Sequence, residues 1–488
     1  MNDTIIENSV NNRNSKKNLS KNIDVASFIR FTKQIKIPEL FGSLPDPRQQ
    51  SKVSYSLSSL ALWAFAACIF RQGSKNALQT TLEQLSSEQQ KGMQYFLGIT
   101  GESLPHYSTV DSALSRVDYE EFNRILLEMF DQMNTRKVFY NHAATLIPEN
   151  IYHIGADGCH LHTYSHPHSV DEHGHNNCPH CLPRKRHAGT EKEETYWVHI
   201  VVTFVFICES FKIPLYVYPL KAMQVDTEQS DEKLKQECEL TAAHAVLILI
   251  RARFPKLKIT FLGDGLYANR PFIRFCKKLT FGYIIVRKEK SLTRLRNKCD
   301  ELAQSDLYQK YYTHLETKRS EDVTIKKKVA WFNGSDLDDG LLTNVLRFEE
   351  EKLNSEGKII SQYKCEWLCS EKISKTHCFK LAKRGRMRWD QEDFHNTCKN
   401  RGFNIEHDMA RTNPGLLFVW KLIAFIAFFV FEIFNLSKIA KAARGKRSLM
   451  KFAKDMLQEL VDVAWNNIKE LNILIKAKVQ FRFDFCSG

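Results

Sequence analysis

The order of strand-like and helix-like segments between residues 151 and 286 constrains the fold of this chain more than any other feature. Short runs rich in β-branched and aromatic residues predict strands, and longer runs with helical spacing of apolar residues predict helices. We expect strands over 151–156, 196–208 and 212–220, a helix over 231–253, a strand over 258–262, a helix over 270–279 and a strand over 283–286. Hairpin strands therefore lead into parallel strands joined by helical crossovers, which predicts an α/β domain.

This order of elements is the ribonuclease H-like topology, and the sequence on each side of it differs in character. Upstream, apolar residues recur at helical spacing, and downstream the chain becomes highly charged and partly β. We predict an α/β ribonuclease H-like core, a mixed sheet with flanking helices, together with a β-rich insertion and an all-α N-terminal domain. The expected boundaries are a disordered tail over 1–24, a helical DNA-binding domain over 25–145, the first part of the core over 146–286 with a His- and Cys-rich loop at 159–190, the insertion over 287–380, the last part of the core over 381–436, and a basic helical region over 437–488.

The composition favours a cytoplasmic protein with a polyanionic partner. With 43% hydrophobic residues among 488, the chain can bury a substantial core, which excludes disorder throughout. A net charge of +14 favours a polyanion, but charge alone does not separate DNA, RNA and membrane. The N-terminal residues do not resemble a signal peptide, and the 13 cysteines then suggest reduced thiols or metal ligands in a bacterial cytoplasm.

One segment, residues 416–434, is almost wholly apolar and close to the length of a membrane span. Lys421 and Glu432 interrupt it, so the longest uncharged run falls well short of the ~18 to 20 residues that a span requires. We therefore favour a buried helix over a membrane anchor and predict no membrane partner. The Lys-rich sequence that follows fits a DNA-facing helix or the positive flank of a span equally well.

Two aspartates follow predicted strands and stand beside glycines. Asp157 ends the first strand in Gly155-Ala156-Asp157-Gly158, and Asp264 ends the fourth in Gly263-Asp264-Gly265. The first and fourth strands are neighbours in the expected sheet, so the two carboxylates would share a divalent cation, which offsets their mutual repulsion. The alternative for either acid alone is an ordinary Asp-Gly turn.

A third acid lies on a predicted helix that begins near residue 388. Arg388, Glu392 and Lys399 are spaced by four and seven residues, which places them within roughly 40° of one another at about 100° per residue. One helix face thus presents a carboxylate between two cations, which suits a site that handles metal and phosphate together. A solvated face with ordinary ion pairing is the simpler explanation for an isolated helix. A separate apolar stripe is formed by Met387, Phe394 and Cys398.

The set Asp157, Asp264 and Arg388-x3-Glu392-x6-Lys399 resembles bacterial insertion-sequence DDE transposases of the insertion-sequence-four type. Their signature is Tyr-x2-Arg-x3-Glu-x6-Lys on a ribonuclease H-like core interrupted by a β insertion. The resemblance covers about 37–435 and includes Leu44-Pro45-Asp46-Pro47-Arg48, Tyr55-Ser56-Leu57, Phe96-Leu97-Gly98-Ile99, Gln236-Glu237-Cys238-Glu239 with Ala242-Ala243, Gly263-Asp264 with Leu266-Tyr267, and Gly402 with Glu406-His407. Two features depart from the family: Gly385 stands where the signature has Tyr, and the Gly-His-Gly that usually follows the Glu-His pair is absent around 410–412.

The resemblance implies two-metal phosphoryl transfer at the ends of a mobile element. Asp157 would bind both Mg²⁺ or Mn²⁺ ions, Asp264 and Glu392 would each complete one coordination shell, and Arg388 and Lys399 would hold DNA phosphates. The basic residues expected to close over the DNA end are Arg287, Lys288, Lys290, Lys326, Lys327 and Lys328. The implied partners are double-stranded DNA, as terminal inverted repeats and target, and a second copy in a synaptic homodimer associated with the nucleoid.

The predicted loop at 159–190 carries candidate zinc ligands. Cys178 and Cys181 have the two-residue gap that bends a chain around a tetrahedral zinc ion. Any of several histidines would supply the other ligands: His160, His162, His166, His168, His173, His175, His180 and His187. We favour a structural zinc site over a polar loop without metal, and a Cys-x2-Cys at a similar place also resembles the family.

Three further functions compete with an active transposase. A degenerate, transposase-derived DNA-binding protein would explain Gly385 and the absent Gly-His-Gly, whereas the intact acid triad favours catalysis. A ribonuclease H-like nuclease or resolvase would share the metal site without requiring the N-terminal domain or the insertion. A basic membrane-associated protein rests on residues 416–434 alone.

Overall fold

The computed structural model describes residues 23–483 apart from 102, 140–149, 175, 222–230, 307, 309–311, 321, 338–339, 411–412, 463–474 and 477–480. Most of the tail expected over 1–24 therefore lies outside the described residues, as do His175 and the end of the basic C-terminal region. Ile23 and Asp24, expected in the tail, begin the first described helix, α2 (Ile23–Gln34).

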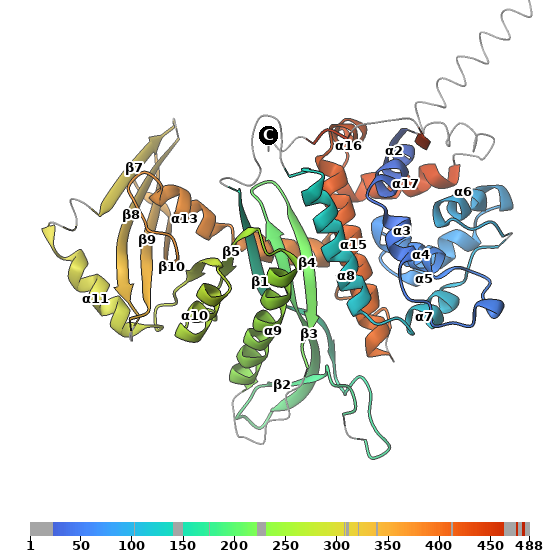
Figure 1. Ribbon diagram of the computed structural model, residues 1–488, viewed down its shortest axis with the longest axis horizontal. Helices are drawn as coiled ribbons and strands as arrows, with labels where there is room; N and C mark the ends of the chain where they lie inside the picture. The colour runs from blue at the N-terminus through green and yellow to red at the C-terminus, as the bar shows by residue number, and fades with distance from the viewer. Residues whose placement is uncertain are drawn as a thin grey trace, which may run out of the picture.

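A mixed sheet forms the centre of the molecule, as the sequence predicted (Figure 1). Its strands are β1 (Ile151–Tyr164), β3 (Glu194–Ile207), β4 (Lys212–Pro219), β5 (Lys258–Gly263) and β6 (Gly282–Val286). They lie in the order β4-β3-β1-β5-β6, with β1 antiparallel to β3 and parallel to β5. Helices α9 (Asp231–Arg253) and α10 (Arg270–Lys278) connect β4 to β5 and β5 to β6. The first and fourth strands of the predicted order are thus neighbours.

The segment 159–190, expected to be a loop, contains strand at both ends. β1 runs on to Tyr164, and β2 (Leu182–Arg186) pairs with β3. The physical reason is that β3 extends far enough for Trp197 to pair with Tyr164 on one side and with Pro183 on the other. Polar, His-rich composition concealed these pairings because it lacks the apolar alternation of a half-buried strand.

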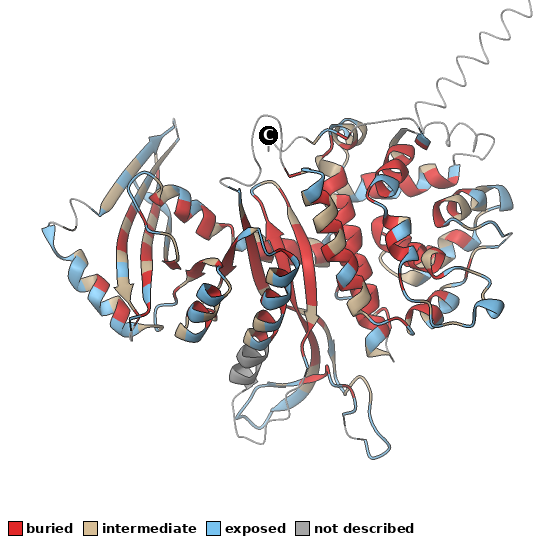
Figure 2. Ribbon diagram, in the orientation of Figure 1, coloured by how far each residue is buried: buried red, intermediate tan, exposed pale blue. Residues whose placement is uncertain are grey.

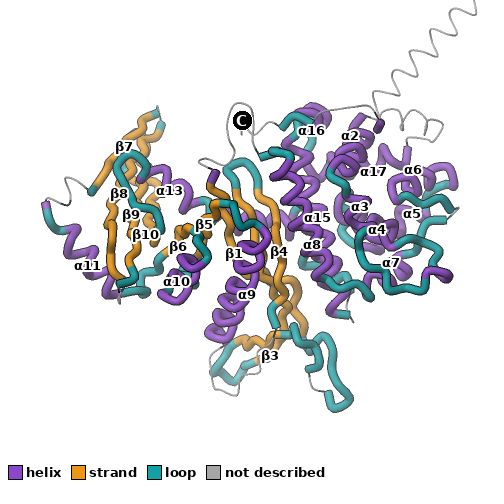
Figure 3. Tube along the Cα trace, viewed as in Figure 1, coloured by secondary structure: helices purple, strands orange, loops and turns teal. Residues whose placement is uncertain are grey.

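The segment after β6 adds a second group of antiparallel strands to the same sheet (Figure 3). It comprises α11 (Thr293–Ala303), β7 (Thr313–Arg319), β8 (Val323–Asp336), β9 (Leu342–Asn354) and β10 (Ile359–Cys369). β10 pairs with both β9 and β6, so the sheet continues from the centre into this lobe. Helices α13 (Cys378–Arg386) and α14 (Trp389–Asn400) then return the chain to the centre.

Helices from both ends of the chain form the remaining lobe. From the N-terminal part come α2, α3 (Ile37–Gly42), the short 3-10 helix η1 (Gln50–Lys52), α4 (Leu57–Ile69), α5 (Lys75–Glu83), α6 (Ser87–Leu97), α7 (Tyr107–Leu114) and α8 (Glu120–Thr135). From the C-terminal part come α15 (Pro414–Leu436), α16 (Lys438–Arg444) and α17 (Leu449–Asp462). α15 contacts α4, α8 and β4, while α16 and α17 contact α2. The N-terminal helices therefore share their core with the end of the chain.

α15 contains the apolar segment singled out in the sequence. It is long and apolar enough to cross a bilayer, but 94% of its most apolar window is buried within the protein (Figure 2). Trp420 donates from Nε1 to Asp111 Oδ1 at 3.0 Å, and the buried ammonium of Lys421 donates to the carbonyl oxygen of His407. Trp420 and Lys421 are thus paired with protein groups, as polar groups in a core helix require.

Candidate functional site

Asp157 lies in the middle of β1, and not at the end of a short strand as expected. It is paired with Thr203 of β3, and β1 continues to Tyr164. The parallel partner β5 ends sooner, because the last pair between β1 and β5 joins Gly155 and Leu262. Asp157 therefore stands just beyond the end of β5, at a step in the sheet. Its side chain is 31% exposed, so the carboxylate is recessed but accessible.

Asp264 follows the last residue of β5 directly, as the sequence predicted. Its Oδ1 accepts a hydrogen bond from the Leu266 amide at 3.0 Å, which fixes the turn after the strand. A Cβ at Gly265 would overlap the side chain of Lys288, the second residue after β6. The glycine thus allows the aliphatic stem of Lys288 to lie over this turn.

Helix α14 is held on the face of the sheet toward which Asp157 points. Gln391 donates from Nε2 to the carbonyl oxygen of Thr203 at 2.8 Å, which attaches the helix to the strand residue opposite Asp157. Gly155 permits this close approach, since a Cβ there would overlap the Gln391 side chain. The apolar stripe predicted for the helix is buried, and Phe394 in it is fully enclosed. The packing therefore sets the position of every polar group on α14.

Glu392 projects from α14 with 42% of its side chain exposed and forms an ion pair with Arg388. The two atoms, Arg388 Nη2 and Glu392 Oε1, are 2.7 Å apart. Arg388 is the N-cap residue of α14, and its guanidinium lies 4.7 Å from the ring centroid of Trp389. The spacing argument placed these two residues on one face, and the structure brings them into contact. Arg388 is consequently committed to Glu392 when no ligand competes for it.

The predicted acids on β1, β5 and α14 act on one another electrostatically. The pKa of Asp157 is raised to about 7, and burial is the largest cause. Negative charge on Glu239, Asp264 and Glu392 contributes to this rise, and Arg388 opposes it. The oxygens of Asp157, Asp264 and Glu392 are not all within 4.8 Å of one another. Asp264 and Glu392 therefore lie near enough to Asp157 to affect its pKa, but the three carboxylates do not form a closed metal cage, and we call the surroundings of Asp157 the recess.

His395, on the next turn of α14, connects the helix to Asp157. Its Nε2 is 2.7 Å from Thr203 Oγ1, and its Nδ1 is 3.7 Å from Asp157 Oδ2. Burial lowers the pKa of His395 to about 4, so the imidazole is neutral at pH 7. Thr203 Oγ1 also accepts from Gln391 Nε2 at 3.3 Å, which leaves the hydroxyl proton for His395 Nε2. This arrangement favours the tautomer that carries its proton on Nδ1, toward Asp157.

A fourth carboxylate, Glu239, reaches β1 from α9. Its side chain is buried, and a Cβ at Gly158 would lie 2.6 Å from Glu239 Oε1. Because neighbouring residues of a strand point to opposite faces, Gly158 faces α9 whereas Asp157 faces α14. Among the charges acting on Asp157, that of Glu239 has the largest effect on its pKa.

Lys399 forms an ion pair with Glu406, with Nζ and Oε1 2.8 Å apart. His162 of β1 contacts the carbonyl oxygen of Glu406 at 3.1 Å through Nδ1. The end of α14 and the segment after it are therefore tied to β1. The Lys399 side chain is 24% exposed, which leaves its ammonium accessible at the surface.

The basic residues expected to cover the DNA end are not equally available. Arg287 is buried and ion-paired with Glu366. The three consecutive lysines of β8 are each paired in register with a glutamate of β9: Lys326 with Glu351, Lys327 with Glu350, and Lys328 with Glu349. Their charge is therefore largely balanced within the sheet. The expectation of a basic clamp over 287–380 was wrong for Arg287, which is buried, and it stays a prediction for Lys288 and Lys290.

The structure explains why no tyrosine stands at position 385. A Cβ at Gly385 would lie 2.7 Å from Trp367 Cε2, so the indole of β10 occupies the space next to α13. A larger side chain at 385 would require Trp367 to move.

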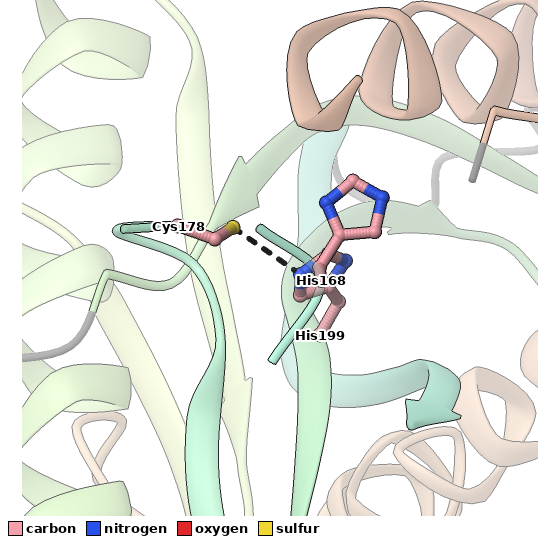
Figure 4. A group of neighbouring side chains, drawn as sticks. All are labelled: His168, Cys178 and His199. Carbon is pink, nitrogen blue, oxygen red and sulfur yellow. Dashed lines mark hydrogen bonds between the residues drawn. The ribbon is translucent and has the colours of Figure 1, made fainter. Parts of the chain in front are cut away.

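A compact cluster of sulfur and nitrogen atoms lies at β3, and Figure 4 shows three of its residues, His168, Cys178 and His199. Cys178 Sγ and Cys181 Sγ are 3.5 and 3.2 Å from His199 Nε2. The ligand atoms of His168, Cys178 and His199 all lie within 4.8 Å of one another. Hydrogen bonding with Cys181 lowers the pKa of the Cys178 thiol well below its ordinary value. Of the other candidate ligands, His180 instead contacts the Leu220 carbonyl oxygen at 2.9 Å.

Sequence reasoning missed His395, Glu239 and His199. His395 lies three residues after Glu392, so helical spacing could have placed it on the same face. Glu239 was noticed only as part of a resemblance, and nothing in its neighbours indicated that it would meet β1. His199 lies within a strongly apolar strand, where a lone histidine is itself a signal of a specific partner.

The fold and site define an α/β protein with a recessed carboxylate site beside a helical lobe. Residues 39–129, which run from α3 through most of α8, match the family described as DDE_Tnp_1-associated. This match indicates a DDE-type transposase family and a transposase-related function. None of the curated proteins matches the chain.

Proposed function

We propose that this chain is a DDE transposase that excises and integrates an insertion sequence by metal-dependent cleavage and joining of DNA. The observation that carries the proposal is that Asp264 and Glu392 both raise the pKa of Asp157, in a chain whose N-terminal helices match a transposase-associated family. The strand order β4-β3-β1-β5-β6 supports a ribonuclease H-like core, and the interrupting strands β7–β10 fit the insertion-sequence-four type.

The chemistry of the recess fits hard divalent cations. Several carboxylates raise the pKa of Asp157, and cations bound among them would remove that repulsion. Oxygen ligands of this kind suit Mg²⁺ or Mn²⁺. Asp157 would hold both ions, and Asp264 and Glu392 one each. When bound, the two cations supply an activated water or 3′ hydroxyl and stabilise the leaving oxygen.

The surrounding cations would bind and orient the DNA phosphates. Arg388 and Lys399 are now paired with Glu392 and Glu406, and a phosphate would compete for these cations once metal holds Glu392. Lys288 lies against the turn after Asp264 and would add a third contact. The lobe that includes 25–145 would bind the terminal inverted repeats, with two copies of the chain bringing two ends and the target together in the nucleoid of a bacterial cytoplasm, away from any membrane.

The test is a cleavage and strand-transfer assay on DNA that carries the flanking ends of the encoding element, with Mg²⁺ or Mn²⁺. Glu392→Gln removes a proposed metal ligand, and we expect it to abolish cleavage while leaving DNA binding intact. Asp390→Asn is the matched control, because Asp390 lies on the same helix but faces Lys212 at 3.5 Å. We expect this control to retain activity within about threefold, as for surface changes away from a site.

The assay also separates the alternatives. DNA binding by the unaltered chain without cleavage in either metal would favour a degenerate, transposase-derived DNA-binding protein, to which Gly385 and its Trp367 neighbour would then be relevant. Cleavage without strand transfer would favour a nuclease or resolvase.

A further inference from the structure

We propose that the cluster of two cysteines and two histidines beside β3 binds one structural zinc ion. Its ligands are His168, Cys178, Cys181 and His199. The site fastens the segment between β1 and β2 to the central sheet, and it is independent of the proposed catalytic metals because none of its ligands is a carboxylate of the recess.

The distances agree with ligands arranged around one small ion. Bonds of ~2.3 Å to sulfur and ~2.0 Å to nitrogen at a tetrahedral angle place a sulfur and a nitrogen about 3.5 Å apart. Cys178 Sγ and Cys181 Sγ are 3.5 and 3.2 Å from His199 Nε2. His168 lies beside them, with its ring centroid 5.1 Å from that of His199. The ligand atoms of His168, Cys178 and His199 already lie within 4.8 Å of one another, and Cys181 Sγ would move the rest of the way to close the site on an ion.

The chain holds the ligands before any metal arrives. The Cys181 amide donates to the Cys178 carbonyl oxygen at 3.2 Å, which closes the Cys-x2-Cys turn. The His168 amide donates to Cys181 Sγ at 3.2 Å, and Asn176 Oδ1 accepts from the Cys178 amide at 3.0 Å. The amide hydrogen bond to Cys181 Sγ stabilises a thiolate there. A zinc ion requires such thiolates.

The two histidines offer one nitrogen each. His168 Nε2 lies 3.3 Å from the Ala410 carbonyl oxygen and donates to it, which leaves Nδ1 as the ligand atom. Nδ1 is buried and has no hydrogen-bond partner among the described residues. His199 is fully buried and directs Nε2 at both sulfurs. An ion would satisfy His168 Nδ1, which is otherwise costly to bury.

Zinc fits this ligand set better than the catalytic cations do. Two sulfurs and two imidazole nitrogens in a tetrahedral, enclosed arrangement are typical of structural zinc, whereas Mg²⁺ and Mn²⁺ prefer oxygen. Aromatic rings close the site: Tyr164 and Phe418 lie 5.1 and 5.8 Å from the His199 ring centroid. No protein ligand position is left for water, so the site is structural.

The test uses the full chain, purified under reducing conditions and loaded with Zn²⁺ alone or Co²⁺ alone. We expect about one zinc per chain by mass spectrometry of the metal after gel filtration. We expect cobalt to give the intense visible bands of a tetrahedral site and thiolate-to-cobalt charge transfer. Cys181→Ser and His199→Asn should each lose at least tenfold in zinc affinity. Cys365→Ser and His173→Asn are the matched controls, since neither residue lies in the cluster, and both should bind as the unaltered chain does.

Three results would overturn the proposal. The first is an unaltered, reduced chain that takes up no zinc. The second is equal zinc binding by the cluster variants and the controls. The third is a cobalt spectrum of the unaltered chain that lacks thiolate-to-cobalt charge transfer. Because this spectrum needs no variant, it tests the proposal even if a variant fails to fold. A Cys178–Cys181 disulfide that persists under reducing conditions would give the first result.

Discussion

At the scale of single residues, Asp157 is held in a place where its negative charge is unfavourable. Its pKa rises from an ordinary value of 3.8 to about 7. Below pH 3.8 the carboxyl is protonated in both folded and unfolded chains, and no penalty exists. Between pH 3.8 and about 7 the unfolded chain releases this proton and the folded chain keeps it. The free energy of unfolding therefore falls as the pH rises through this range, and it levels off above pH 7.

We therefore predict that Asp157→Asn stabilises the metal-free protein at pH 8. The gain should be about 1 to 4 kcal/mol, because asparagine carries no charge to penalise, and it should shrink toward pH 4. Urea unfolding at both pH values in the presence of a chelator measures it. A gain that does not change with pH would show that repulsion at Asp157 is not its source.

His395 gives a second prediction at this scale. Asparagine reproduces the position of the histidine Nδ1 donor, whereas glutamine reproduces the position of Nε2. If His395 orients Asp157 through Nδ1, His395→Asn should keep Mn²⁺ affinity within about threefold, and His395→Gln should lose about 10- to 100-fold, as for other residues that orient a metal ligand. Titration of Mn²⁺ by electron paramagnetic resonance distinguishes them, with thermal melting as the folding control. The reverse ranking would assign the role to the Thr203 contact.

The sequence predicted residues whose signals are local, and it missed those that depend on pairing across the sheet. Asp264 after β5 and the shared face of Arg388 and Glu392 follow from strand ends and helical spacing. The place of Asp157 within β1 depends on where β5 stops, and the meeting of His199 with Cys181 depends on strand register. Neither register nor relative strand length can be obtained from one segment alone.

At the scale of elements, the open edge of β4 is covered by α8. Asn123 of that helix donates from Nδ2 to the Val217 carbonyl oxygen at 3.0 Å and accepts from the Val217 amide at 2.9 Å. An amide side chain thus takes the place of a neighbouring strand at this residue and blocks further pairing there. It also fixes the helical lobe to the sheet.

We predict that Asn123→Ala costs about 2 to 4 kcal/mol of unfolding free energy, because it leaves a buried amide and a buried carbonyl without partners. Arg124→Ala, at an exposed position of the same helix, should change stability by less than about 0.5 kcal/mol. Chemical denaturation of both variants checks this. A loss at Asn123 no larger than at Arg124 would mean that the edge is held by apolar packing alone.

Element order was predicted more successfully than element boundaries. The alternation from β1 to β6 was evident because these strands, apart from β2, contain β-branched and aromatic runs bounded by turns. β2 was missed because its sequence is polar, and its existence depends on the length of β3. Helices α2 and α17 pack against each other although they are more than 400 residues apart in the sequence. No local sequence pattern predicts such a contact.

At the scale of the whole molecule, the net charge of +14 is unevenly available to DNA. Lys327 lies 3.8 Å from Glu350, whereas the stem of Lys288 lies against Gly265, the residue after Asp264. We predict that Lys288→Ala weakens binding of the element's ends about 5- to 20-fold. The slope of log affinity against log salt concentration should fall by the contribution of about one phosphate contact. Lys327→Ala should change neither by more than about twofold. Binding isotherms at several salt concentrations test this. Equal losses of affinity in the two variants would mean that the lysines of the insertion contact DNA as Lys288 does.

The central claim is that Asp157, Asp264 and Glu392 together hold the catalytic cations, and exchanging one ligand atom tests it most directly. Asp264→Cys replaces hard oxygen by sulfur, which binds Mg²⁺ poorly and Mn²⁺ better. We predict that this variant cleaves the element's ends at least 100-fold more slowly than the unaltered chain in Mg²⁺. In Mn²⁺ its cleavage rate should be at least tenfold higher than in Mg²⁺. Cleavage by the variant in Mg²⁺ at the rate of the unaltered chain would contradict the claim.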